Sequence, residues 1–159
     1  MMLPRVLALL LATALAATAG FMLFAPGVWY IHFPGAAETG PYNPHFVRLL
    51  GCVFAVGAAV LAVYGLRRKD PPASGLVAFA AFVAADALIH LWEIDALGAH
   101  AWAALLRDLP GVYLPAVLTV WFARSALAAR RTQQPTGGAP FMIGQELAEQ
   151  ATLRSLRLR

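Results

Sequence analysis

Four long, almost purely apolar stretches restrict this chain to a membrane-spanning helical fold. They run from Val6 to Phe24, Leu49 to Leu66, Gly75 to Leu91 and Gly111 to Ala129. Each is close to the ~20 residues that an α-helix needs to cross ~30 Å of hydrocarbon. Only 13% of the residues are charged and 60% are hydrophobic, whereas soluble domains carry about 25% charged residues. The sequence therefore predicts an all-α integral membrane protein and excludes the soluble classes.

The spacing of these stretches predicts an antiparallel four-helix bundle. One transmembrane domain is expected over residues 1–131, followed by a cytoplasmic linker and an amphipathic basic tail over 132–159. The expected spans are about 4–25, 45–67, 74–94 and 110–130. Leucines interspersed with polar residues between Ala96 and Leu109 predict a short interfacial helix between the third and fourth spans.

The first span has some features of a signal peptide. Arg5 precedes the apolar run, and small residues occupy Ala14 to Ala19. The apolar run continues through Phe24, which is long for the core of a signal peptide. We therefore expect this segment to be retained as a transmembrane helix.

Basic residues gather at one set of span ends and predict the orientation. They flank the first, second and fourth spans at Arg5, Arg67, Arg68, Lys69, Arg130 and Arg131. Cytoplasmic segments carry the excess of Lys and Arg, so both termini are expected in the cytoplasm. The net charge of +4 fits contact with anionic lipid headgroups. The sequence contains no basic segment with interleaved aromatic residues, so it does not predict a nucleic-acid partner.

Three ionisable residues lie on one face of the third span. Asp86, His90 and Glu93 are separated by four and three residues, and such spacing places side chains on the same side of a helix. An ionisable side chain in lipid costs several kcal/mol, roughly 2.5–3.5 for Asp on insertion scales. The three side chains therefore need partners, water or a ligand.

The second span supplies candidate partners for these three residues. In an antiparallel bundle the start of the second span lies level with the end of the third span. The start of the second span carries His45 and Arg48. The predicted ligand-binding cluster is His45, Arg48, Asp86, His90 and Glu93. Arg107 and Asp108 are expected above it, and Cys52, the single cysteine, on the same side as Arg48.

Four interpretations of this cluster stay open from the sequence. It can be a hydrogen-bonded ion-pair network that only clasps the bundle, or a site for a small molecule, lipid or quinone-like ligand. It can be a Zn, Fe or Mn site formed by His45, His90 and Glu93 with Asp86, or a haem site ligated by two histidines. The corresponding functions are a ligand-binding protein or membrane-complex subunit, a redox or metal-dependent oxidoreductase subunit, and a structural accessory protein. A second copy of the chain is a further candidate partner.

Three segments resemble a bacterial family of four-span membrane proteins, similar in layout to the DoxX-like superfamily. They are Thr39 to Arg48, His90 to Glu93 and Asp108 to Pro115. The resemblance covers the four spans and not the tail. It implies the bacterial inner membrane, a quinone-linked role or a place in a redox-linked membrane complex. The acidic residue usual after Arg48 in that family is replaced here by Leu49, and no residue transfers the family's thiosulfate:quinone activity.

Overall fold

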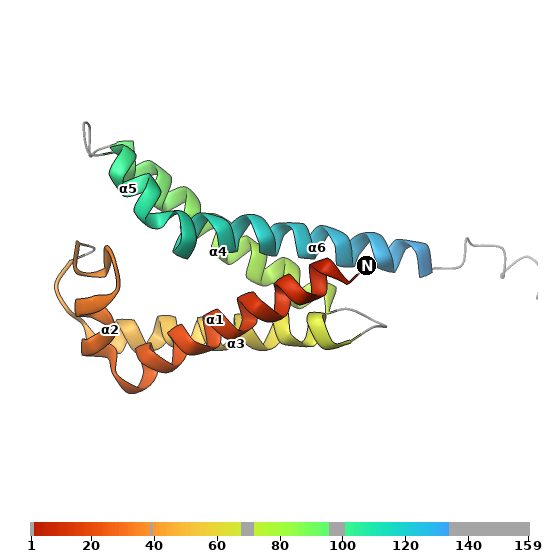
Figure 1. The fold of residues 1–159 in the computed structure, drawn as a ribbon, viewed down its shortest axis with the longest axis horizontal. Coiled ribbons are helices and arrows are strands. Elements are labelled where there is room, and N and C mark those ends of the chain that lie inside the picture. Colours follow the sequence, from red (N-terminus) through yellow and green to blue (C-terminus); the bar gives the residue numbers. More distant parts are fainter. Residues whose placement is uncertain (1, 39, 68–71, 96–100, 134–159) are drawn as a thin grey trace, which may run out of the picture. The chain divides into compact units, whose positions relative to one another are not determined.

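The structure is a computed structural model of the chain, and it describes residues 2–38, 40–67, 72–95 and 101–133. Within these ranges helices are the only regular secondary structure (Figure 1). The chain divides into two units, Met1–Ala128 and Ala129–Arg159. The fold and the site described below belong to the first unit. The tail predicted over 134–159 lies outside the described residues.

Four helices are long and apolar enough to cross a membrane, which confirms the all-α, four-span fold. These stretches are Leu3–Phe24, Pro44–Leu66, Ala73–Ile94 and Ala101–Thr132. In chain order the elements are α1 (Leu3–Phe24), α2 (Pro26–His32), η1 (Ala36–Glu38), α3 (Pro44–Leu66), α4 (Ala73–Asp95), α5 (Ala101–Asp108), η3 (Leu109–Tyr113) and α6 (Leu114–Gln133). The chain is therefore a helical membrane protein with four spans.

Local sequence signals explain where these helices begin. The side chain of Asn43 accepts hydrogen bonds from the backbone N–H groups of His45 and Phe46, at 3.0 and 3.1 Å, and so caps α3. Pro44 and Pro26 occupy the first positions of α3 and α2, where the missing N–H costs nothing. Pro26 also separates α2 from the end of α1. The loop between the first two spans thus contains two short helices, α2 and η1, that the sequence did not predict.

The segment between the third and fourth spans is continuous with the fourth span. α5 leads directly into η3, a stretch of π-helical turns, and η3 leads into α6. The interfacial helix expected up to Leu109 thus joins the span without a break, and its residues 96–100 lie outside the described residues. Pro110 lacks a backbone N–H, and π turns are one way in which a helix accommodates such an interruption.

α1 and α3 pack along each other at very short range (Figure 1). A Cβ atom at Gly51 would lie 2.9 Å from the Cβ of Met22, and one at Gly65 would lie 2.5 Å from the Cγ of Leu9. Glycine at these two contact points lets the helix backbones approach closely. Small residues at helix contacts are the usual means of association in membranes, where dispersion contacts replace the hydrophobic effect.

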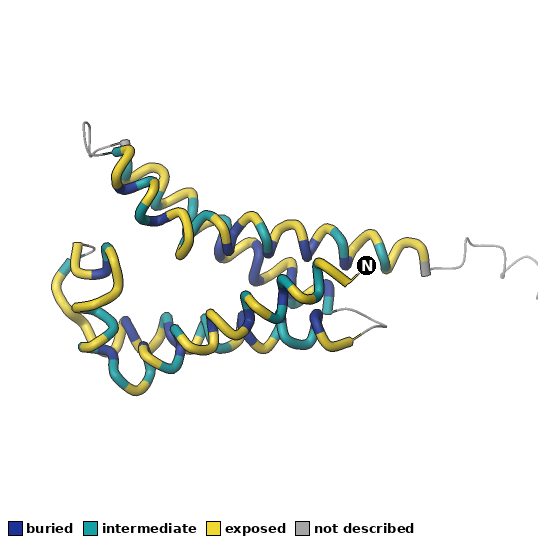
Figure 2. The backbone as a smooth tube through the Cα atoms, viewed as in Figure 1, coloured by how far each residue is buried: buried dark blue, intermediate teal, exposed yellow. Residues whose placement is uncertain are grey.

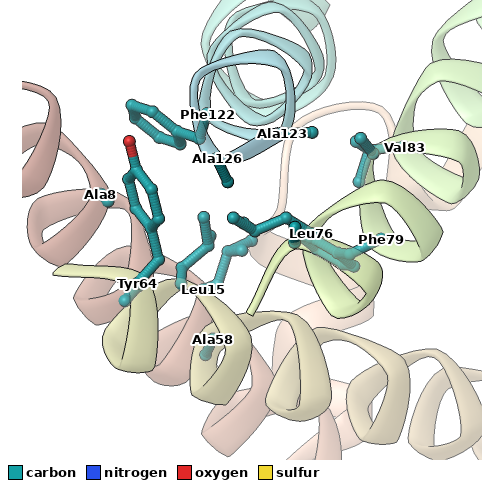
Figure 3. Packing of buried hydrophobic residues seen from close by; sticks show 14 of the residues in the cluster. Ala8, Leu15, Ala58, Tyr64, Leu76, Phe79, Val83, Phe122, Ala123 and Ala126 are labelled. Atoms are coloured by element: carbon teal, nitrogen blue, oxygen red, sulfur yellow. The ribbon is translucent and has the colours of Figure 1, made fainter. Parts of the chain in front are cut away.

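One buried core joins the four spanning helices (Figure 3). Its larger members are Leu15 from α1, Leu61 and Tyr64 from α3, Leu76, Phe79 and Val83 from α4, and Phe122 from α6. Figure 2 shows that buried and exposed positions alternate along each spanning helix. Large apolar side chains such as Leu10, Val56, Leu88 and Val117 are exposed, as expected for faces that meet lipid.

Replacement of Gly57, on α3, tests how tightly α3 packs on α4. A Cβ atom at Gly57 would overlap ring atoms of Phe79, so Gly57→Ala must displace a buried ring. We expect a loss of about 1–3 kcal/mol of stability, as for other overpacked cores. Gly20→Ala is the control, because a Cβ there meets nothing within 4 Å and alanine favours the helix. Thermal unfolding in detergent should show a lower Tm only for Gly57→Ala; equal shifts would contradict the close contact.

Candidate functional site

The centre of the candidate site is Asp108, a carboxylate that is only 7% exposed at the end of α5. Arg107 approaches it with two guanidinium nitrogens: Nε lies 2.8 Å from Oδ1 and Nη2 lies 3.4 Å from Oδ2. The ring Nδ1 of His90, on α4, lies 3.1 Å from Oδ2. Nη1 of Arg107 also donates to Oε2 of Glu38 at 2.5 Å. We call Glu38, His90, Arg107 and Asp108 the Asp108 network.

The Asp108 network joins three separate segments of the chain, and a glycine makes one of these contacts possible. Gly35 precedes η1 with a φ of +83°, a conformation that glycine adopts without strain. A Cβ at Gly35 would lie 3.0 Å from Nε and Cζ of Arg107. The turn before Glu38 can therefore pass directly over the guanidinium, and this brings Glu38 within reach of Arg107.

The predicted stripe on α4 contributes His90 to this network. Asp86 is half-buried, and its separation of four and seven residues from His90 and Glu93 places the three side chains on one face of α4. Glu93 is exposed, and His90 is partly exposed. The stripe therefore meets α5 through His90.

His45 and Arg48 lie elsewhere. Both are exposed, and Nε of Arg48 donates to the backbone oxygen of Leu23, at 3.3 Å, near the end of α1. Within the described ranges, no hydrogen bond or ion pair links either residue to α4. The described residues also contain no group of three His, Cys, Asp or Glu side chains placed to hold a metal ion. The set His45, His90 and Glu93 is thus not brought together as a metal site.

Two buried polar atoms have no hydrogen-bond partner among the described residues. They are Nε1 of Trp29, on α2, and the hydroxyl of Tyr113, on η3. The Trp29 ring stacks on Phe33 with centroids 5.0 Å apart, and Phe33 Cζ would lie 3.5 Å from a Cβ at Gly111 in η3. The Tyr113 hydroxyl interacts electrostatically with Asp108. A chain of contacts therefore links both atoms to the same part of the fold.

Buried polar groups of this kind are expected to bond to water or to a ligand. A buried donor or acceptor without a hydrogen bond costs about 1–3 kcal/mol, and a specific unpaired group in a folded protein calls for an explanation such as a bound molecule or water. π-helical turns like those of η3 are also frequent at functional sites. A ligand that hydrogen-bonds to Trp29 and Tyr113 would satisfy both atoms.

The geometry fixes which ring nitrogen of His90 meets Asp108. The carboxylate is an acceptor, so the hydrogen of their shared bond resides on Nδ1, and in the neutral form of the ring Nε2 carries a lone pair. A carboxylate held against one ring nitrogen orients the ring and favours proton acceptance at the other. Nε2 can therefore accept a hydrogen bond or a proton from a hydroxyl group.

The sequence predicted His90 as a site residue but not the contacts it makes, and it placed Arg107 and Asp108 above the cluster. Glu38, Trp29 and Tyr113 were not predicted as site residues. The contact between His90 and Asp108 could have been predicted from the connection between the third and fourth spans, because that connection places the two residues at the same end of neighbouring helices. The four spans define the chain as a multi-pass helical membrane protein. No protein-family model, curated protein or solved structure matches it.

Proposed function

We propose that this membrane protein binds a small, neutral, amphiphilic ligand with hydroxyl or carbonyl groups, of the quinone or quinol type, at the Asp108 network. The observation that supports the proposal is the bond between the buried carboxylate of Asp108 and the partly exposed His90, in the same part of the fold as two unpaired polar atoms, Trp29 Nε1 and Tyr113 OH. His90 Nε2 accepts from a ligand hydroxyl. Trp29 and Tyr113 donate to a ligand carbonyl.

The charges of the network favour a neutral ligand. Arg107 uses three of its nitrogens on Glu38 and Asp108, so its charge is already balanced by two carboxylates. Asp86 and Glu93 add further negative charge on the neighbouring turns of α4. An anionic ligand would meet net repulsion here. His45 and Arg48, which the sequence placed in the predicted ligand-binding cluster, have no part in this proposed site.

The cellular setting is proposed from the sequence. The basic residues at the span ends support cytoplasmic termini, and the DoxX-like resemblance supports the bacterial inner membrane. The same resemblance supports a quinone as the ligand and a membrane complex as a partner. The lipid bilayer, which surrounds the four spans, is the remaining partner.

Binding of decylubiquinone tests the proposed function. The full chain, reconstituted in phosphatidylcholine nanodiscs, is titrated while tryptophan fluorescence is recorded. We expect saturable quenching, because the proposal has Trp29 donate to the ligand. His90→Gln should raise the Kd about tenfold, as expected for the loss of one hydrogen bond worth about 1.4 kcal/mol. His45→Gln is the matched control and should leave the Kd unchanged.

Two results would contradict the proposal. Quenching that rises linearly without saturation would mean that the quinone only partitions into lipid. If His90→Gln lowers the Tm but leaves quinone binding unchanged, the Asp108 network is only a clasp between helices. Unchanged circular dichroism of both variants verifies that their folds are comparable.

A further inference from the structure

An apolar groove runs along the surface between α1 and α3, apart from the Asp108 network. Its volume is about 480 Å³, within the ~300–1,000 Å³ typical of small-molecule sites. Small residues line it from both helices, among them Ala16 and Gly20 on α1 and Ala55 and Ala59 on α3. A Cβ at Gly20 would meet nothing within 4 Å. The protein's own side chains therefore leave the groove open there.

The lining of the groove suits a hydrocarbon chain. Among the described residues that line it, Thr13 alone has a polar side chain, and its hydroxyl donates to the backbone oxygen of Leu9 at 3.0 Å. The groove thus offers an occupant no unpaired side-chain hydrogen-bonding group. A polar molecule would lose its hydrogen bonds with water on entering it, whereas an acyl chain has none to lose.

The guanidinium of Arg48 places a positive charge at one end of the groove. Arg48 is exposed, and its Nε bonds to the backbone oxygen of Leu23, which itself belongs to the groove lining. No carboxylate in the described part of the chain pairs with Arg48. A guanidinium has five N–H donors, so four remain for a ligand, in a planar geometry that matches a phosphate group.

The length of the groove fits a lipid tail that begins at this charge. Along α1 the lining extends from Leu9 to Phe24, which at 1.5 Å per residue corresponds to about 22 Å. One leaflet contributes about half of the ~30 Å hydrocarbon thickness. A tail whose headgroup lies at Arg48 can therefore follow the groove through its whole leaflet.

We infer that the groove between α1 and α3 binds one anionic glycerophospholipid, with its phosphate at Arg48 and one acyl chain between the helices. Arg48 gives the site its charge preference, and the small residues around Ala16 and Ala59 give it room for the chain. This inference does not depend on the ligand proposed for the Asp108 network. A helix of a second copy of the chain is the competing occupant, since small residues also favour helix association.

Native mass spectrometry of the full chain in detergent micelles tests the inference. The protein is titrated with dioleoyl-phosphatidylglycerol and, separately, with dioleoyl-phosphatidylcholine. We expect one retained lipid per chain, with about a tenfold preference for phosphatidylglycerol, equivalent to about 1.4 kcal/mol. Arg48→Gln should abolish the preference. Arg67→Gln, at the other end of α3 and also exposed, should preserve it.

A second pair of variants tests the groove itself. Ala16→Leu fills the groove and should reduce retention of both lipids at least several-fold, whereas Ala17→Leu changes an exposed neighbour outside the lining and should not. Ala59→Leu repeats the test from α3 if Ala16→Leu does not fold. Equal phosphatidylglycerol retention in the wild type, Arg48→Gln and the groove-filling variant would overturn the inference. If the wild type is a dimer, and a groove-filling variant is a monomer that binds lipid as the wild type does, the groove binds a second copy of the chain instead.

Discussion

Replacement of Asp108 by asparagine is expected to lower the free energy of unfolding by about 3 kcal/mol, the lower end of the effect of removing one partner from a buried ion pair. Asn has nearly the same shape but no charge. Arg107 would keep only the exposed carboxylate of Glu38, and His90 would lose its charged acceptor. The effect stays near 3 kcal/mol because Glu38 still compensates part of the charge of Arg107. Urea unfolding in detergent micelles, followed by circular dichroism, measures it.

Glu38→Gln is the control for this prediction. Glu38 bonds to the same guanidinium, but its side chain is 67% exposed, and exposed ion pairs contribute about 0–1 kcal/mol. We therefore expect a change of less than about 1 kcal/mol for Glu38→Gln. Equal losses in the two variants would mean that burial of Asp108 does not govern the stability of the network.

The four spans were predictable because spanning a membrane depends on local sequence. An apolar run of sufficient length forms a helix in lipid whatever it packs against, since every backbone hydrogen bond must be made within the segment. α1, α3 and α4 therefore begin and end within a few residues of the expected bounds. α2 and η1 were missed because a seven-residue and a three-residue helix leave no such apolar signal.

The partners of the site depend on helix rotation, which a sequence does not specify. The spacing of Asp86, His90 and Glu93 places them on one face of α4 in any packing arrangement. Whether that face meets Arg48 or Asp108 depends on how α3 and α5 are turned about their axes. In the structure Arg48 faces the end of α1, where it bonds to Leu23. His90 meets Asp108, eighteen positions further along the chain.

Replacement of Phe122 by alanine is expected to cost about 3 kcal/mol or more, as for other fully buried Phe→Ala changes. Phe122 is 0% exposed, and its ring centroid lies 5.5 Å from that of Tyr64 across α6 and α3. Figure 3 shows the two rings side by side in the core. Alanine would leave a void between the helices. Unfolding in the same detergent measures the loss.

Val117→Ala on the same helix is the control that distinguishes the loss of contacts between helices from the mere loss of apolar side-chain surface. Val117 is 66% exposed on a face that meets lipid, and lipid tails contact an apolar side chain as well as another helix does. Its truncation should therefore change stability by less than about 0.5 kcal/mol, as at other surface positions. Because the hydrophobic effect does not hold helices together inside lipid, the large cost at Phe122 must come from lost contacts in the core. Similar losses at Phe122 and Val117 would show instead that α6 is not packed as the structure has it.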